Sequence, residues 1–248
     1  MKKRLLILGM IFTMAVSSAG CGSSSSDNSG KADQSKQTAT VQDSQKDTSN
    51  DSKSDNDKKD TKYKSADEIT MDDLMSHDET SAEDFEFNDG ADEIVIQKYV
   101  GKNPIVVIPD EIDGKKVVGF ESAFTLNNNI VAVKIGNNVQ EVENSAFSGC
   151  KQLKYVVMGD SVKTIGGRMF AQTNLQELVL NDGLQKIGQD DSNNVLAPPS
   201  SNCGMDLKIP ESVTELHVSE FNLIGKSGSY AEQYANEHAD AGVTFTAE

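Results

Sequence analysis

Tryptophan is absent from this sequence, and histidine and cysteine occur only three times each in 248 residues. No pair of them has the spacing of a metal site, so no metal ligand is assigned. Glycine occurs 19 times but forms neither a phosphate-binding loop nor a dinucleotide fingerprint, and no cofactor is expected. A triad of His217 with Asp206 and Ser219 is not supported by their spacing. We interpret His217 as an exposed edge residue, and no catalytic residue is assigned.

Positive charge is also scarce. The formal net charge is −16 at pH 7, which argues against nucleic acid and against binding to anionic lipid by charge alone. A membrane-spanning run is lacking as well, because the apolar stretch from Leu5 to Val16 is too short to cross a bilayer comfortably.

That short apolar stretch is instead typical of an export signal. It follows Lys2-Lys3-Arg4 and precedes small residues, which predicts a signal peptide over residues 1–20. The sequence Ser18-Ala19-Gly20-Cys21 resembles the lipobox of bacterial lipoproteins, although Ser18 stands where that family usually has Leu. The resemblance implies a diacylglyceryl group on Cys21. The alternative is ordinary cleavage after Ala19 or Gly20, which would release a soluble protein.

Two polar segments follow. Residues 21–64 are rich in Ser, Asp, Lys, Gln and Thr and cannot bury enough apolar area to fold, so we predict a lipid-anchored disordered spacer. Residues 65–84 form an acidic flank, in which Ser65-x-x-Glu68 has the form of a capping box and a short helix is an option. Its acidic residues lack the spacing of a calcium loop, and we interpret the flank as solvated.

One pattern is written three times between Ala123 and Ile187. Ala123-Phe124, Ala146-Phe147 and Met169-Phe170 recur at steps of 23 residues, and we expect the three Phe rings to stack as a spine opposite a sheet. An apolar ladder follows each Phe at the same offsets, one residue earlier in the third copy: Ile130, Val133, Ile135, Val139 and Val142; Leu153, Val156, Met158, Val162 and Ile165; Leu175, Leu178, Leu180, Leu184 and Ile187. Such a period predicts a solenoid.

These repeats resemble the BspA-like leucine-rich repeats of bacterial surface proteins. The residues that carry the resemblance run from Ser145 to Leu153 and from Ser161 to Gly166, and the phrase returns from Ile209 to Leu216. The resemblance covers residues 85–248. It implies a repeat solenoid, a leucine-rich-repeat-like right-handed β-solenoid with short parallel strands, and it implies a binding role without naming a ligand.

Both ends of this domain carry cap signals. The strand-like runs around Asn88-Asp89-Gly90 predict an N-terminal β-hairpin cap that turns at positive-φ residues. The helical spacing from Ser229 to His238 predicts a short C-terminal helix cap, and Val243-Thr244-Phe245 is expected to close the core. Between them, the segment from Asp190 to Gly204 reads as an inserted loop, after which Phe221 is expected to be the last spine position.

The two remaining cysteines leave alternatives open. Cys150 occupies a small-residue position inside a repeat, where Cys is commonly a buried neutral group, and Cys203 lies in the inserted loop. A disulfide between them is the alternative.

Strand alternation predicts which side chains point outward from the sheet. One outward row is Val107, Lys134, Val157, Val179 and Lys208, and a second is Ile105, Ala132, Tyr155, Glu177 and Asp206. An apolar patch facing water often marks a contact surface, so the predicted partner-binding residues are Ile105, Val107, Tyr155, Val157 and Val179. The alternative is that β-propensity alone placed valine there.

These observations predict a lipid-anchored cell-surface protein on the outer face of the bacterial cell membrane, not an enzyme. Its repeats would bind a protein or glycan partner, and the resemblance implies host matrix proteins or neighbouring cells. One alternative is a cell-envelope structural scaffold that binds another envelope protein or glycan. Another is an enzyme with a site in the loop from Asp190 to Gly204.

Overall fold

The computed structural model describes residues 63–189 and 196–248. The predicted signal peptide, Cys21 and residues 22–62 of the spacer lie outside the described residues. Within the described residues, no helix is both long and apolar enough to cross a membrane. The elements are α1 (Met71–Met75), η1 (Ala82–Asp84), β1 (Phe85–Asp89), β2 (Glu93–Tyr99), β3 (Ile105–Val107), β4 (Glu111–Ile112), β5 (Lys115–Phe120), β6 (Ala132–Lys134), β7 (Glu141–Val142), β8 (Tyr155–Val157), β9 (Thr164–Ile165), β10 (Glu177–Val179), β11 (Lys186–Ile187), η2 (Ser200–Asn202), β12 (Met205–Lys208), β13 (Glu215–Leu216), β14 (Phe221–Gly225), α2 (Tyr230–Glu237), η3 (Ala239–Ala241) and β15 (Thr244–Ala247).

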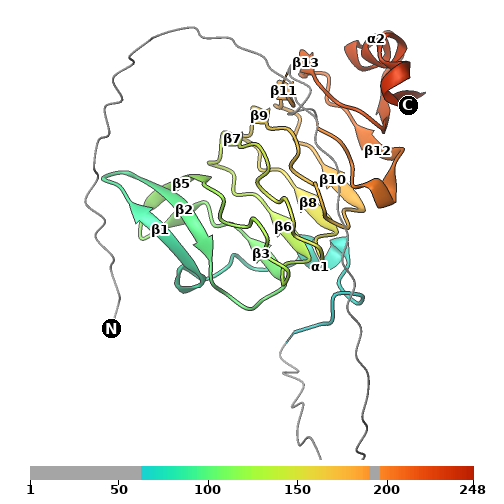
Figure 1. Cartoon of the computed structure of the whole chain (residues 1–248). Coiled ribbons are helices and arrows are strands. Elements are labelled where there is room, and N and C mark those ends of the chain that lie inside the picture. Colours follow the sequence, from blue (N-terminus) through green and yellow to red (C-terminus); the bar gives the residue numbers. More distant parts are fainter. Residues whose placement is uncertain (1–62, 190–195) are drawn as a thin grey trace, which may run out of the picture. The chain divides into compact units, whose positions relative to one another are not determined.

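The repeats form a parallel solenoid, as predicted. Each coil places one strand in a first sheet, of order β10-β8-β6-β3, and one in a second sheet, of order β13-β11-β9-β7. A third sheet, of order β12-β14-β15, follows at the C-terminal end of the stack (Figure 1). All three sheets are parallel, and their strands are two to five residues long.

The predicted strand register is confirmed across the first sheet. Ile105 pairs with Ala132, which pairs with Tyr155, which pairs with Glu177. The row of Val107, Lys134, Val157 and Val179 is equally in register. The prediction is wrong for the fifth residue of each row, Asp206 or Lys208. Both residues belong to β12, where they pair with Asn222 and Ile224 of β14. The insertion after β11 separates β12 from the first sheet.

The aromatic spine is confirmed and is longer than predicted. Phe124, Phe147 and Phe170 are fully buried, and their ring centroids lie 5.5 and 6.3 Å apart in sequence order. Tyr99 continues the series, 6.2 Å from Phe124, and Phe85 lies 5.6 Å beyond it. The repeats and the N-terminal cap therefore share one continuous core.

Phe221 is not a spine residue, although it is fully buried. It begins β14 and pairs with Met205, and the stacked rings end at Phe170 within the described part of the chain. The coil that follows β12 is shorter than the earlier coils. The chain therefore enters β14 at the point where each earlier coil forms the turn that contains its Phe.

The repeat has a glycine in the turn after a first-sheet strand, and close packing of neighbouring coils accounts for it. A Cβ on Gly159 would lie 2.3 Å from the carbonyl oxygen of Gly136 in the preceding coil, so neighbouring backbones approach too closely for a side chain. The third copy has Asn181 at this place, and its Nδ2 donates to the carbonyl oxygens of Asp160 and Val162, at 3.1 and 3.0 Å. These contacts link the turns of successive coils.

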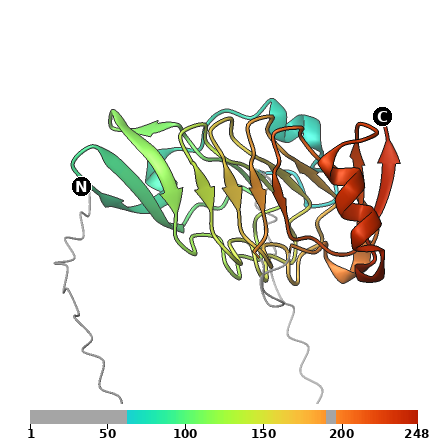
Figure 2. The same ribbon diagram turned by 90° about the horizontal axis from the view of Figure 1, so that it is seen from above.

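Both caps are present, at opposite ends of the stack (Figure 2). β1 and β2 form the predicted antiparallel hairpin, and β2 continues into a sheet of order β1-β2-β5-β4. The predicted turn is misplaced, because Asn88 and Asp89 lie within β1 and none of Asn88, Asp89 and Gly90 has a positive φ. At the other end, the predicted helix is α2, and Val243 is buried beside β15, where it closes the core as expected.

Phe147 provides a test of the spine, because it has a stacked ring on both sides. Phe147→Ala should lower the free energy of unfolding by about 3–5 kcal/mol, the usual cost of truncating a buried aromatic residue. The measurement is chemical denaturation of the purified protein. The control is Leu126→Ala, since Leu126 is 68 % exposed in the corresponding turn of the preceding coil and its truncation should cost less than about 0.5 kcal/mol. Equal midpoints for the two variants would contradict the spine.

Candidate partner-binding surface

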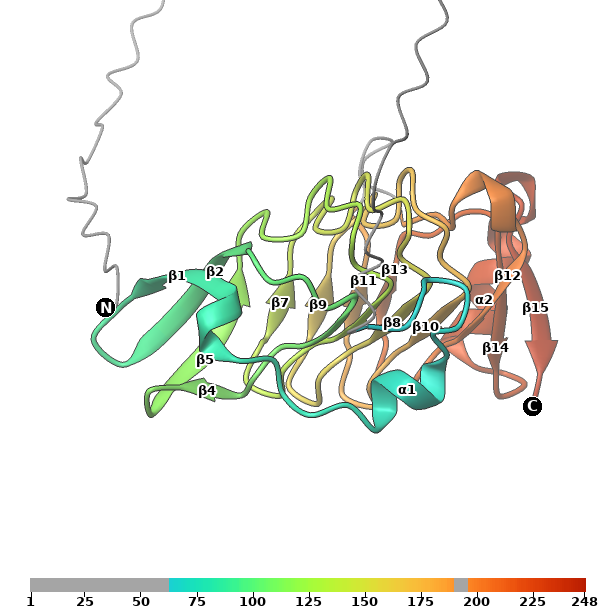
Figure 3. The ribbon, with the colours of Figure 1, turned by 90° about the horizontal axis from the view of Figure 1, so that it is seen from below.

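The outer face of the first sheet is covered by the chain itself. Residues 63–80, here called the strap, run along this face and place α1 beside the strands (Figures 1 and 3). Ile69 and Leu74 of the strap are buried to 2 % and 0 % exposure. They form a small apolar cluster that is separate from the solenoid core, with Ile105, Val107, Val131, Ala132 and Val157.

Polar contacts hold the strap at three places. The Thr80 N–H donates to the Val107 carbonyl and the Val107 N–H donates to Thr80 Oγ1, both at 2.9 Å, which satisfies one edge of β3. Lys154 Nζ donates to the Ala66 carbonyl at 2.9 Å and lies 3.1 Å from Asp67. Asn103 Nδ2 lies 2.9 Å from His77 Nε2.

The strap contains a helix that begins later than its first capping signal suggests. Ser65 and Glu68 make only one half of a capping box: the Ser65 N–H donates to Glu68 Oε2 at 3.0 Å, and the Ser65 hydroxyl donates to the same oxygen at 2.6 Å. Residues 66–68 form only a turn. α1 starts after Thr70, whose side chain forms a complete capping box with Asp73. Hydrogen bonds from Lys64 and Thr70 lower the pKa of Asp73. The acidic residues of this flank are mostly exposed, as expected, whereas its apolar residues Ile69 and Leu74 pack on the sheet.

The strap determines which of the predicted binding residues a partner could reach. The strand phase was right, since all five side chains point away from the solenoid core. The expectation that they face water is wrong for Ile105, Val107 and Val157, which are 7 %, 7 % and 6 % exposed beneath the strap. Tyr155 is half-buried at the edge of the strap, and its hydroxyl donates to Gln176 Oε1 at 3.2 Å. Val179 is 39 % exposed.

The outward side chains change character where the strap ends. Beside the strap they are mainly aliphatic, whereas β10 and the third sheet present mainly polar ones: Glu177, Asp206, Lys208, Asn222, Thr244 and Thr246. Asn222 connects several of these residues, donating to Asp206 Oδ1 at 2.7 Å and accepting from Thr244 Oγ1 at 3.0 Å. The outward valines of β3 and β8 are therefore covered by the strap, a segment of the same chain. The sequence signal for that cover is the set Ile69, Met71, Leu74 and Met75 in an otherwise acidic segment.

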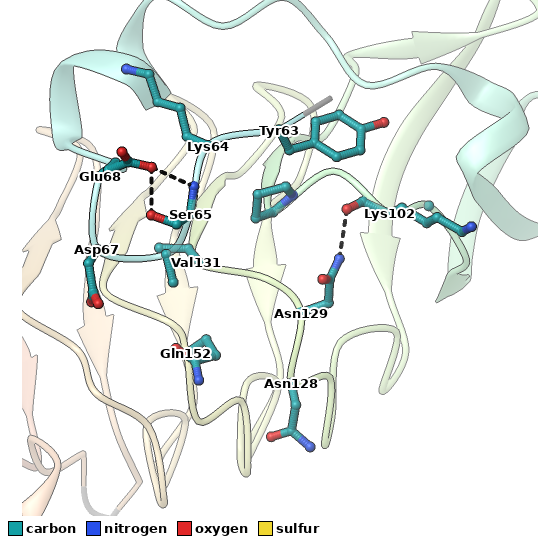
Figure 4. A pocket seen from close by; sticks show the side chains of 13 residues that line it. Tyr63, Lys64, Ser65, Asp67, Glu68, Lys102, Asn128, Asn129, Val131 and Gln152 are labelled. Atoms are coloured by element: carbon teal, nitrogen blue, oxygen red, sulfur yellow. Dashed lines mark hydrogen bonds between the residues drawn. The ribbon is translucent and has the colours of Figure 1, made fainter. Parts of the chain in front are cut away.

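Two hollows flank the strap. The first, of about 1060 Å³, lies between the first strap residues and the turn that contains Asn128 and Asn129 (Figure 4). The polar contacts drawn in it are made within its own walls: Ser65 donates to Glu68, and Asn129 Nδ2 donates to the Lys102 carbonyl at 2.9 Å. The second hollow, of about 720 Å³, is a groove between β10 and β12, beyond the strap. Val179 and Ile224 border it.

The second sheet presents a polar outer face. His217 is half-buried there rather than exposed, with Nε2 3.2 Å from Glu215 Oε1. Lys186 also pairs with Glu215, and its hydrogen bond is the main reason for the lowered pKa of that carboxyl. His217 therefore shares the Glu215 carboxylate with Lys186, while the side chain of Asp206 accepts a hydrogen bond from Asn222 in the third sheet.

The two cysteines of the repeat domain are not joined by a disulfide. Cys150 is fully buried, its Sγ donates to the Phe124 carbonyl at 2.8 Å, and burial raises its pKa to about 11. Cys203 is exposed, and a hydrogen bond to Glu220 raises the pKa of its thiol. Cys150 thus acts as a small core residue. Within the described residues, no cluster of three or more His, Cys, Asp or Glu residues could hold a metal ion.

Comparison with known proteins agrees with the coil geometry. Residues 120–195 match the family described as the BspA type leucine rich repeat region (6 copies). The protein carries BspA-type leucine-rich repeats. Repeats of this type are typically binding scaffolds and suggest protein–protein interaction. A search of curated proteins finds no match.

A solved leucine-rich repeat protein from T. pallidum is similar to this chain. The two share 29 % sequence identity, and the similarity covers 59 % of this chain and 71 % of that chain with a TM-score of 0.49.

The attachment of the strap can be tested at Leu74. Leu74→Ala should reduce the free energy that holds the strap by about 2–5 kcal/mol, because the side chain is fully buried. Hydrogen exchange of the Thr80 amide, which bonds to Val107, should accelerate, while the amides of the spine repeats keep their protection. Met75→Ala is the control, since the adjacent Met75 is 54 % exposed. Unchanged protection at Thr80 in the Leu74 variant would contradict this role.

Proposed function

We propose that this protein is exported, is anchored by lipid on Cys21 to the outer face of the bacterial cell membrane, and uses its leucine-rich repeats to bind a macromolecular partner at the cell surface. The repeats support protein binding, since BspA-type repeats suggest protein–protein interaction. The lipobox-like sequence that ends at Cys21 and the polar segment after it support the anchor and the surface location.

The surface that we propose for the partner is the end of the outer sheet face that the strap leaves uncovered. The observation that carries this assignment is Val179, which is 39 % exposed at the border of the groove between β10 and β12. Tyr155 lies on the neighbouring strand β8, in register with Glu177, two residues before Val179. The sequence-predicted surface is thereby reduced from five residues to Tyr155 and Val179, because the other three are occupied by the strap.

Several coils have to contribute to such a surface. One coil presents only three residues of first-sheet strand, of which two point outward. The row from Tyr155 through Glu177, together with Val179 and Ile224, brings three strands into one contact area. This is how a repeat protein builds a binding surface that no single repeat is large enough to provide.

The anchor is tested by replacing the lipid-accepting residue. Cells that make the Cys21→Ala variant should release the protein into the medium or retain it unprocessed, whereas the unmodified protein should partition into detergent. Cys203→Ala is the control, because Cys203 lies in the repeat domain and its loss should leave partitioning unchanged. Equal solubility of the Cys21 variant and the unmodified protein would contradict lipid anchoring.

The partner surface is tested at Val179. Val179→Lys should leave the thermal midpoint nearly unchanged, since the side chain is already partly in water, and should weaken binding of a partner by about 1–2 kcal/mol or more. The partner is first captured by crosslinking on intact cells, and its affinity is then measured in purified form. The control is Thr164→Lys, which places the same charge on β9 of the second sheet. Equal affinities for the two variants would place the contact elsewhere.

A further inference from the structure

The C-terminal cap covers the apolar end of the stack but leaves one strand edge open. α2 packs against β14 and β15, with Ala231, Tyr234 and Ala235 buried. β15 pairs with β14 on one side and is the last strand of the third sheet. It is also the outermost strand at the C-terminal end of the stack in two opposite views (Figures 2 and 3). Its second edge therefore faces solvent.

The backbone of β15 directs hydrogen-bonding groups to this open edge. The Glu248 N–H donates to the Gly225 carbonyl at 3.0 Å, so the peptide groups of Glu248 point toward β14. Peptide groups alternate in direction along a strand of a parallel sheet. Thr246 consequently also bonds toward β14, whereas the N–H and C=O of Phe245 and Ala247 point to the open edge. A further strand could pair with these groups.

This edge lacks the protection that other strand edges of the protein have. Natural proteins protect edges with charges, bulges, proline or a covering segment. β1 carries Glu86 and Asp89 and has a register shift after Glu86. The edge of β3 is bonded to Thr80 of the strap, and β12 lies directly beside β10. β15 reads Thr-Phe-Thr-Ala, with no charge, no proline and no register shift.

The open edge is complementary to itself. When two copies of β15 run antiparallel about a two-fold axis at Thr246, Phe245 lies opposite Ala247 of the second copy, and the reverse. These are the residues whose N–H and C=O point outward, so both pairs exchange their main-chain hydrogen bonds. Each Phe245 ring then lies beside a methyl group. Thr244 lies opposite Glu248, so no like charges meet although the chain carries a net charge of −16.

We propose that β15 pairs antiparallel with β15 of a second copy of this chain, which joins the third sheets of two molecules into one continuous sheet. The contact is isologous, as in most dimers with two-fold symmetry. It is also short, well below the area of a stable interface, so the dimer is expected to be weak and to form at high local concentration. The inference goes beyond the proposed function and depends on neither the lipid anchor nor the surface at Val179.

Disulfide cross-linking tests the register of the pairing. The purified full chain carries Cys21→Ala and Cys203→Ala, which leaves only the buried Cys150. With Thr246→Cys added, the two thiols belong to directly opposite residues with Cα atoms about 4.5 Å apart, within disulfide range. With Thr244→Cys, the matched control, they lie four positions apart along the strands, about 13 Å.

Mild oxidation should therefore produce a covalent dimer of the Thr246→Cys chain and little of the Thr244→Cys chain. Equal yields from the two chains would indicate random collision and would refute the two-fold register. The absence of dimer from both would refute the pairing itself.

Sedimentation equilibrium tests the main-chain hydrogen bonds without a cross-link, on the chain that carries Cys21→Ala. Ala247→Pro removes an outward N–H from each copy but no hydrogen bond to β14, and should weaken self-association about tenfold or more. Ala247→Ser, which keeps the N–H, is the control and should associate as the parent does. Both variants should keep the thermal midpoint. Equal association of the two variants, or a parent that stays monomeric at about 1 mM, would refute the proposal.

Hydrogen exchange identifies the edge that is used. On concentration of the Cys21→Ala chain, the amides of Phe245 and Ala247 should gain protection, while the Thr246 amide, which already bonds to β14, should not change. Dimer formation without added protection at Phe245 and Ala247 would place the contact elsewhere and would refute pairing through β15.

Discussion

The structure depends on the contact between one coil and the next. A coil of about 23 residues has no second layer of its own, so its apolar side chains become buried only when neighbouring coils cover them. The stacked rings of Phe124, Phe147 and Phe170 and the backbone ladders of the sheets are two expressions of this dependence. It also explains the caps, because a stack that lacked them would leave an apolar end and an unpaired strand edge at each terminus.

The same constraint accounts for the strap. The outer side of the first sheet carries aliphatic side chains on β3, β6 and β8, and these would face water if the strap were absent. Ile69 and Leu74 bury them, while the acidic residues of the strap stay on its outer side and keep it soluble. The strap therefore covers the aliphatic side chains of β3, β6 and β8 with an acidic segment and leaves Val179 of β10 exposed.

The interruption between β10 and β12 has its origin in the insertion that follows β11. The regular coils bring each strand back within pairing distance of the previous one, as the register from β3 to β10 shows. The longer connection delivers β12 to a partner on its other side, β14, with which it forms a complete ladder. The groove between β10 and β12 lies at the point where the period of the sequence fails.

The local and periodic features of this protein could be predicted from its sequence. The 23-residue step, the alternation of the short strands and the hairpin and helix signals predicted the solenoid, the spine and the strand phase, because each depends on side-chain spacing along the chain. The exact hairpin turn, the start of α1 after Thr70 and the place of Phe221 were missed, since each depends on packing against another part of the chain. Two features depend on tertiary packing: residues 63–80 cover Ile105, Val107 and Val157, and the sheet breaks between β10 and β12. Strap and sheet lie far apart in the sequence, and no spacing rule connects an acidic flank to the outward side of strands that only the folded stack brings together.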